Sequence, residues 1–339
     1  MILGRVSDFH IRPQDRAIRD LELGGTTELI EIFGETPFKP QEKDATEHSF
    51  FITEGGNHVI MTNRFFNKEG EVVDTQGKKA AFGGAQGKVR HGVWFSQSDS
   101  ENPKPAAVKK ASLGRPGMTG DNGLSFAREA YYLSLCEGPN VIKLYDSFAG
   151  DNQKAYLIAE AGNCALGSDD ARALITNNLS TLKRLTADSL NGLAAIHAQG
   201  VMHRDIKPDN ILVRNNGEPV LIDFGSARQS TAQRTVALVS TGYSPVEALS
   251  SDTPHGEFTD IYSVSATFYM LITGSPPADA ASRVLEESYE PLIGDESLAG
   301  YSRDFLSRID RGLAALPSDR PQTIREWLST VSPSIVESA

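Results

Sequence analysis

The chain has 339 residues, 39% of them hydrophobic, which is enough to bury a sizeable core and suits one two-lobed domain with an appendage. A formal net charge of −11 at pH 7 argues against nucleic acid or an anionic membrane as a partner. Two cysteines make no disulfide framework, residues 1–14 lack a secretory signal, and no apolar run is long enough to span a bilayer. We therefore expect a cytoplasmic protein without a membrane span.

Residues 1–76 contain three short segments that are typical of β-strands, at 49–53, 58–62 and 71–73, with turn-forming residues between them. The pattern predicts a small β-meander. Such a unit is too short for a core of its own, so we expect it to dock on the domain that follows. Whether it only extends a sheet, or also receives a regulatory partner or a chaperone, stays open.

A glycine-rich segment at residues 82–89 has the composition of a loop that wraps an anion. Gly83, Gly84 and Gly87 lack a Cβ, which lets backbone N–H groups approach a phosphate closely. The same composition is also typical of an ordinary β-turn. The segment by itself does not decide between the two.

A lysine and a glutamate further along the chain are expected to form an ion pair. Residues 106–109 predict a strand that carries Lys109, and residues 125–133 have helical periodicity. Glu129 lies on the apolar face of that helix, where a carboxylate is costly unless it is paired or reaches water at the edge of the face. Lys109 is the natural partner.

The most informative segment is residues 203–210, His-Arg-Asp-Ile-Lys-Pro-Asp-Asn. It places a proton acceptor, Asp205, two residues before a cation, Lys207. Asp-Phe-Gly follows at residues 223–225. A proton acceptor, a phosphate-directed cation and magnesium ligands in one short stretch indicate phosphoryl transfer.

The residues between these two motifs predict a hairpin. Apolar runs at 211–213 and 220–222 flank an Asn-Asn-Gly turn. Folding at that turn sets Asn210 beside Asp223. Two oxygen ligands at one end of a hairpin make a Mg²⁺ site that takes its other ligands from water and nucleotide phosphates.

Downstream, residues 258–274 are apolar nearly all round, begin at Thr and Asp capping residues and stop at Gly274, which predicts a buried central helix. The ordered set of motifs resembles the eukaryotic-type serine/threonine protein kinase superfamily. The stretches GEFTDIYSVSATFYMLITGSPP and DRPQTIREWL are most similar to soluble bacterial members. The resemblance covers about residues 77–335.

The resemblance implies an α+β fold of two lobes. A small β-rich N-lobe with one key helix would take residues 77–161, and a larger, mostly helical C-lobe would take residues 162–335. Residues 1–76 would then be an N-terminal extension to a protein kinase domain. The implied cofactors are ATP and Mg²⁺.

By the same resemblance, Asp205 would accept or orient the proton of the substrate hydroxyl, and Lys207 would contact the γ-phosphate. Lys109 would anchor the ATP phosphates with Glu129 as its partner. The metal ligands would be Asn210 and Asp223. A lysine two residues after the catalytic acid is the form seen in Ser/Thr-directed members, so the expected substrate is a Ser/Thr protein.

The implied nucleotide-binding residues come from the glycine-rich loop, two strands, the connection at residues 156–162 and the hairpin. They are Gly83, Gly84, Gly87, Val89, Ala107, Lys109, Glu160, Gly162 and Leu212. The sequence departs from the family at one point, because Phe82 stands where the first glycine is expected. Because of that departure, the sequence does not decide the shape of the phosphate-binding loop.

The family also suggests framework and regulatory residues. Asp260 is expected to cap the backbone of the catalytic loop, and Glu247 and Arg320 are expected to form a buried pair. Ser240 takes the place of a hydroxyl that bonds the catalytic Asp and Lys. Between residues 225 and 244 the chain is rich in hydroxyl groups, and regulatory phosphorylation at Thr231 or Thr235 stays open.

The leading hypothesis is an ATP-dependent Ser/Thr protein kinase that also phosphorylates itself. The altered glycine-rich loop leaves a pseudokinase scaffold as the alternative. A small-molecule kinase is disfavoured, because Lys207 and the segment through Glu247 serve a polypeptide substrate. The chain is expected in the cytoplasm, and a secreted bacterial effector that acts in a host cell remains an alternative.

Overall fold

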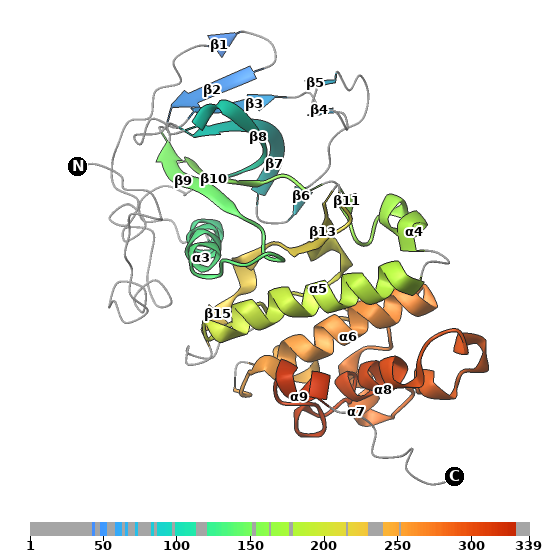
Figure 1. Cartoon of the computed structure of the whole chain (residues 1–339). Coiled ribbons are helices and arrows are strands. Elements are labelled where there is room, and N and C mark those ends of the chain that lie inside the picture. The colour runs from blue at the N-terminus through green and yellow to red at the C-terminus, as the bar shows by residue number, and fades with distance from the viewer. Residues whose placement is uncertain are drawn as a thin grey trace. The chain divides into compact units, whose positions relative to one another are not determined.

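The computed structural model describes residues 43–44, 48–52, 58–62, 65–66, 72–73, 83–84, 87–96, 99–112, 121–150, 154–162, 164–175, 179–214, 216–229, 240–250 and 252–329. The chain forms two compact units (Figure 1). The small unit comprises Met1–Glu137 and Ile142–Gly162, and the large unit comprises Gly138–Val141 and Asn163–Ala339. In the described part of the chain, no helix combines the length and hydropathy that crossing a membrane requires.

The small unit is built on an antiparallel sheet of eight strands in the order β1-β2-β3-β7-β8-β10-β9, with β6 paired to β7. Its strands are β1 (Lys43–Asp44), β2 (His48–Ile52), β3 (His58–Thr62), β6 (Gly83–Gly84), β7 (Gly87–Ser96), β8 (Asp99–Ser112), β9 (Leu144–Gly150) and β10 (Lys154–Glu160). A separate pair joins β4 (Phe65–Phe66) to β5 (Val72–Val73). The helix in the described part of this unit is α3 (Asp121–Leu135).

Strand β3 joins residues before position 76 directly to the sheet. Its residues 58–61 pair with residues 92–95 of β7, while the short β6 pairs with residues 87–88 of the same strand. Strands were expected at 49–53 and 58–62, and β2 and β3 occupy these positions. The division into an extension, 1–76, and a kinase domain, 77–335, stays a prediction.

The core of the small unit includes apolar and aromatic side chains on alternate positions of β8 and β10. Ala106 and Val108 of β8 and Tyr156 and Ile158 of β10 form one buried cluster. Trp94 packs against it, with its ring stacked on Tyr145 at 4.8 Å between centroids. Helix α3 buries the face predicted for it, made of Phe126, Glu129, Ala130 and Leu133, and Cys136, the residue after the helix, is buried as well.

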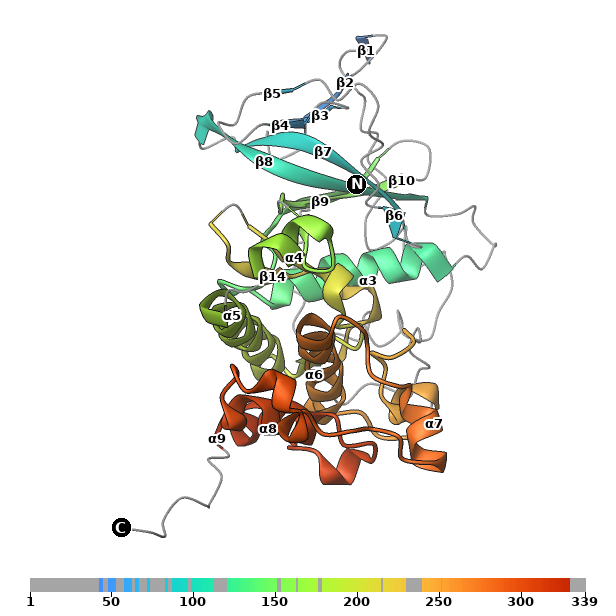
Figure 2. The ribbon, with the colours of Figure 1, turned by 90° about the vertical axis from the view of Figure 1, so that its right-hand side faces the viewer.

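The large unit is mostly helical (Figure 2). Its helices are α4 (Asp169–Ile175), α5 (Leu179–Ala198), α6 (Glu257–Thr273), α7 (Ala280–Leu285), α8 (Arg303–Gly312) and α9 (Ile324–Ser329). Its 3₁₀ turns are η1 (Pro208–Asn210), η2 (Phe224–Ser226), η3 (Val246–Leu249), η4 (Leu292–Gly294), η5 (Glu296–Leu298) and η6 (Pro317–Asp319). Its strands are β11 (Cys164–Ala165), β12 (Val201–Met202), β13 (Ile211–Val213), β14 (Pro219–Leu221) and β15 (Arg228–Gln229).

Residues 138–141 belong to the large unit because they bond to β14 and pack on α5. The Asn140 carbonyl accepts a hydrogen bond from Leu221 N at 2.9 Å, and Asn140 Nδ2 donates to the Pro219 carbonyl at 3.0 Å. Gly192 of α5 makes the close approach possible, since a Cβ there would lie 2.6 Å from the Asn140 carbonyl oxygen. A side chain at 192 would push this segment off the helix.

Helix α6 is the central helix of the large unit, and the predicted burial is confirmed for most of its length. It ends at Gly274 with φ +83°, the left-handed conformation that glycine adopts without strain. Its start differs from the expectation: the N-cap is Gly256, not a Thr or Asp. Thr259 accepts from Gly256 N, and the Asp260 carboxylate bonds other parts of the fold instead of capping its own helix.

A buried ion pair ties η3 to η6. Arg320 Nη1 donates to Glu247 Oε1 at 2.6 Å, and both residues are buried. Arg320 also donates to the carbonyls of Ala314 and Ala315, and its guanidinium lies 4.8 Å from the centre of the Tyr262 ring. The predicted pairing of Glu247 with Arg320 is confirmed.

Candidate active site

The loop after β12 is held by a buried carboxylate of α6. Asp260 Oδ2 accepts a hydrogen bond from His203 N at 2.8 Å, and Asp260 Oδ1 accepts one from Arg204 N at 2.7 Å. Arg204 has φ +65°, a left-handed conformation that costs a non-glycine residue energy. Asp260 therefore caps the backbone of this loop as predicted, at the point where the backbone is strained.

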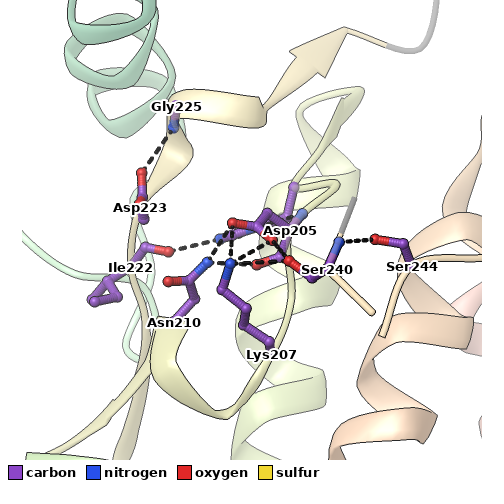
Figure 3. A network of polar contacts seen from close by, with 9 residues as sticks. Asp205, Lys207, Asn210, Ile222, Asp223, Gly225, Ser240 and Ser244 are labelled. Carbon is purple, nitrogen blue, oxygen red and sulfur yellow. Dashed lines mark hydrogen bonds and ion pairs between the residues drawn. The ribbon is translucent and has the colours of Figure 1, made fainter. Parts of the chain in front are cut away.

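Asp205 lies at the centre of a polar network (Figure 3). Lys207 Nζ donates to both of its carboxylate oxygens at 2.9 Å. Asn210 Nδ2 donates to Asp205 Oδ2 at 2.8 Å and to the Asp205 carbonyl at 2.7 Å. The three residues that the sequence placed in one loop thus contact one another directly.

Ser240 joins this network from a distant part of the sequence. Its Oγ donates to Asp205 Oδ1 at 3.0 Å and lies 3.1 Å from Lys207 Nζ, which donates to it. Ser240 N in turn donates to Ser244 Oγ at 2.8 Å. The expected contacts of Ser240 are present, whereas Thr231 and Thr235 lie outside the described residues.

The predicted hairpin is confirmed by the pairing of β13 with β14, which aligns Ile211 with Leu221 and Leu212 with Val220. Ile222 N donates to the Asn210 carbonyl at 3.0 Å, so Asn210 and Asp223 end on the same side of the hairpin (Figure 3). Asp223 has φ +63°, and its Oδ1 accepts from Gly225 N at 3.3 Å.

The ring of His203 supports the same end of the hairpin. Its Nε2 lies 2.9 Å from the Ile222 carbonyl, which can only accept, so this nitrogen carries the proton. The ring also packs on the fully buried Phe224 at 5.0 Å between centroids. Among the described residues, no three His, Cys, Asp or Glu side chains gather as a metal site. Asn210 and Asp223 stay the metal ligands that the family resemblance implies.

The small unit holds the other predicted pair. Lys109 Nζ lies 2.5 Å from Glu129 Oε2, and both side chains are buried. Lys109 is on β8, opposite Val89 of β7 and Leu157 of β10, and Glu129 is on α3. The ion pair expected from the inward-facing Glu129 is confirmed.

The remaining residues predicted to bind the nucleotide are divided between the two units. In the small unit, Gly83 pairs with Lys88 and Gly84 with Gly87, which makes a tight hairpin, and Phe82 lies outside the described residues. Ala107 on β8 pairs with Ala159 of β10. Glu160 ends β10 and its N–H donates to the Lys143 carbonyl, and Gly162 is the last residue of the unit. Leu212, in contrast, belongs to β13 of the large unit.

Sequence reasoning did not single out two residues that contact Asp260 or its partner. His197 Nε2 lies 2.8 Å from Asp260 Oδ2, and His197 Nδ1 lies 3.3 Å from Glu257 Oε2. A signal was available, since His197 is a titratable group that precedes the His-Arg-Asp motif by six residues. Burial by itself raises the pKa of Asp260, but bonds and charges from His197 and the loop outweigh it and hold the pKa below its ordinary value.

Comparison with known proteins agrees with this geometry. Residues 83–323 match the model of the protein kinase domain. The chain belongs to the protein kinase family. Its fold class is therefore the two-lobed α+β kinase fold that the motifs predicted, with a β-rich unit that carries helix α3 and a mostly helical unit.

Named relatives include serine/threonine kinases of bacteria. The chain is 30% identical over 239 residues to the serine/threonine-protein kinase PkaA of Streptomyces coelicolor, covering 64% of this chain and 43% of PkaA. It is 30% identical over 167 residues to the serine/threonine-protein kinase PknA of Nostoc, covering 46% of this chain and 29% of PknA.

A eukaryotic relative and a solved structure extend the comparison. The mitogen-activated protein kinase HOG1 of Saccharomyces cerevisiae is 28% identical over 253 residues, which cover 73% of this chain and 56% of HOG1. The solved structure described as the PpkA-294 apo form matches with a TM-score of 0.61 and 26% identity, covering 80% of this chain and 94% of that one. The chain spans about half the length of the curated relatives PkaA and HOG1.

Proposed function

We propose that the chain is an active serine/threonine protein kinase, which transfers the γ-phosphoryl group of ATP to the hydroxyl of a Ser or Thr in a protein. The observation that carries the proposal is the contact set around Asp205. A carboxylate, an ammonium, an amide and a hydroxyl from two segments 30 residues or more apart meet in one network. A scaffold that only bound a partner would not require this arrangement.

In the proposed reaction, Asp205 accepts or orients the proton of the substrate hydroxyl as its oxygen attacks the γ-phosphorus. The new O–P bond forms while the bond to the ADP oxygen breaks, and the proton passes to Asp205. Lys207 balances the charge that develops on the transferred group. Ser240 holds Asp205 and Lys207 in position, since it bonds both.

Asn210 and Asp223 suit magnesium, which prefers oxygen ligands. The Asn210 side chain uses Nδ2 for both of its hydrogen bonds to Asp205, which turns its Oδ1 toward the hairpin end where Asp223 lies (Figure 3). When bound, Mg²⁺ would neutralise the phosphate charge. We propose these two residues as its protein ligands.

For the nucleotide, we propose Lys109 as the phosphate anchor. Glu129 holds the ammonium in place inside the small unit, so less side-chain entropy is lost when a phosphate binds. We further propose that the hairpin of Gly83, Gly84 and Gly87 covers the phosphates. The adenine ring would contact Val89, Ala107, Glu160, Gly162 and Leu212, as in the family.

Autophosphorylation is part of the proposal, because the sequence between residues 225 and 244 is rich in hydroxyl groups. The pseudokinase scaffold is the competing interpretation. It rests on Phe82 at the first glycine position, and the complete set of Lys109, Glu129, Asp205 and Asn210 speaks against it.

The test is phosphate transfer from γ-labelled ATP by wild type, Asp205→Asn and Asp304→Asn. Asp304→Asn makes the same chemical change at an exposed surface pair on α8. We expect Asp205→Asn to lower the rate about 100-fold or more and Asp304→Asn to leave it unchanged. Equal, background-level signals from wild type and Asp205→Asn would instead support the scaffold.

A further inference from the structure

A buried histidine in the large unit lies between two carboxylates. The His197 side chain is 3% exposed; its Nε2 is 2.8 Å from Asp260 Oδ2, and its Nδ1 is 3.3 Å from Glu257 Oε2. A carboxylate oxygen accepts hydrogen bonds and donates none, so Nε2 is stabilised by carrying a proton. Nδ1 makes no aligned hydrogen bond to Glu257, so a proton on Nδ1 is stabilised by the charge of that carboxylate at ion-pair distance. The geometry therefore favours the doubly protonated imidazolium.

His197 shares an acceptor with the catalytic loop. Asp260 Oδ2 accepts from both His197 Nε2 and His203 N, while Oδ1 accepts from Arg204 N. Asp260 is fully buried, and a buried carboxylate without a cation would be strongly destabilised. The charge of His197 thus compensates the group that holds Arg204 in its left-handed conformation.

Glu257 is the outer member of this arrangement. Its side chain is 33% exposed, in contrast to those of His197 and Asp260. Its Oε2 also accepts a hydrogen bond, at 3.0 Å, from the backbone N of Ile324, which is the first residue of α9. One carboxylate therefore contacts both the buried histidine and the start of the last described helix.

We propose that Glu257 is a positioning residue for phosphoryl transfer, which keeps His197 protonated so that Asp260 stays charged and holds the catalytic loop. The inference rests on the proposed kinase function. It concerns a residue that contacts neither the substrate nor the reacting atoms and acts through His197.

The charged groups around His197 set the pH range over which its ring titrates. Asp260 and Glu257 face it from α6, His203 and Arg204 lie across Asp260 in the loop, and His255 precedes α6. Burial lowers the pKa of His197, but the two carboxylates outweigh it and raise the pKa from 6.5 to about 9. His255 has a pKa lowered to about 4 by burial and by Arg204, so it is neutral near pH 7.

The sign follows from the raised pKa. The protonated His197 stabilises the folded chain, because its pKa is higher there than in the unfolded chain. This stabilisation is fully present below pH 6.5, where His197 would be protonated even in the unfolded chain, and is lost as pH rises through about 9. Removing the Glu257 charge lowers the pKa of His197 by about one unit. The loss of loop order then moves to lower pH by the same amount.

The experiment compares kcat and the KM for ATP of wild type and Glu257→Gln between pH 6 and 9.5. The glutamine keeps an oxygen for Ile324 N and removes only the charge. We expect equal kcat at pH 6.5 and about threefold lower kcat for Glu257→Gln at pH 8.5, from a one-unit shift, with KM unchanged. A loss of the same size at every pH would indicate a merely structural role and overturn the proposal.

Thr323→Ala is the matched control for α9. Thr323 Oγ1 accepts from Glu326 N at 3.0 Å, so its removal loosens the start of the same helix without changing a charge near His197. We expect the pH profile of this variant to follow wild type. If Thr323→Ala reproduces the shift seen for Glu257→Gln, helix order and not charge is responsible, and the proposal fails.

A second readout does not depend on activity. The ring nitrogens of His197 and the backbone amide of Arg204 can both be followed by NMR on uniformly ¹⁵N-labelled full-length protein, and the His197 signals can be assigned with His197→Gln. We expect His197 to titrate with a midpoint near pH 9 in wild type and at lower pH in Glu257→Gln. In both proteins, the chemical shift of the Arg204 amide should change over the same pH range as the His197 ring. A midpoint near 6.5 in wild type, or an Arg204 signal that does not respond, contradicts the inference even if transfer is active; an inactive wild type with the expected titrations refutes the proposed function instead.

Discussion

Two non-glycine residues in the described part of the large unit adopt left-handed backbone conformations, and they are Arg204 and Asp223. Each costs about 1–3 kcal/mol unless neighbouring bonds fix it. Asp260 bonds the backbone at Arg204, and the side chain of Asp223 bonds Gly225 N. Strain that is held by specific bonds on both sides of Asp205 and Asn210 agrees with a site whose geometry is set before the substrate arrives.

At the scale of residues, the sequence predicted a contact where one energetic cost, that of burying an unpaired carboxylate, outweighed the others. An inward-facing carboxylate needs a cation, and the resemblance to the kinase strand–helix ion pair pointed to Lys109 as the partner of Glu129. The contacts of His197 did not follow from the sequence, because its partners on α6 come 60 residues later. Only the packing of α5 against the start of α6 reveals them.

The pair of Glu247 and Arg320 allows a prediction about stability. We expect Glu247→Gln to lower the free energy of unfolding by about 3 kcal/mol, because it leaves the buried Arg320 charge without its counter-ion. Urea unfolding measures the change. Asp304→Asn, which removes the partner of the partly exposed Arg308, should cost about 0.5 kcal/mol. Equal losses of unfolding free energy in the two variants would argue that the Arg320 charge is not buried.

At the scale of elements, β1, β2 and β3 share a sheet with β8, the strand that carries Lys109. Strand β3 pairs with residues 92–95 of β7, and β7 pairs with β8 along most of its length. The periodicity of residues 49–53 and 58–62 predicted these strands, but not the partner of β3. Register and partner depend on which edge is available, and this is a property of the assembled sheet.

Truncation tests the contribution of these strands. We expect removal of residues 1–76 to lower the melting temperature of the chain relative to removal of residues 1–42, because only the longer deletion exposes the edge of β7 to which β3 bonds. Differential scanning fluorimetry and the yield of monomer on gel filtration measure the two variants. The same melting temperature and yield for both would show that β7 needs no partner from this region.

At the scale of the whole molecule, the chain combines two compact units with an overall negative charge. Both the match to the protein kinase domain, residues 83–323, and the match to the PpkA-294 structure run through both units. The net charge of −11 acts on a substrate through the summed field of the protein and not through one contact. Peptides with basic residues around the acceptor hydroxyl should therefore associate faster.

Salt dependence tests this effect. We expect kcat/KM for a basic peptide to fall about tenfold between 0.05 and 0.3 M NaCl, since salt screens long-range attraction. A neutral peptide with the same acceptor serine should change less than about twofold. A parallel fall for both peptides would mean that salt acts on the enzyme itself and not on the encounter.

The sequence by itself determined the hairpin that brings Asn210 and Asp223 to the same side, since residues 210–223 are local in the chain and their geometry follows from turn and strand rules. It also determined the family and the ion pair of Lys109 with Glu129. The tertiary structure alone decided how Glu257, His197 and Asp260 meet, and which strand completes the edge of β7. These contacts join segments distant in the sequence, and the free energy that selects them comes from burial and charge compensation in the folded state, which no local pattern encodes.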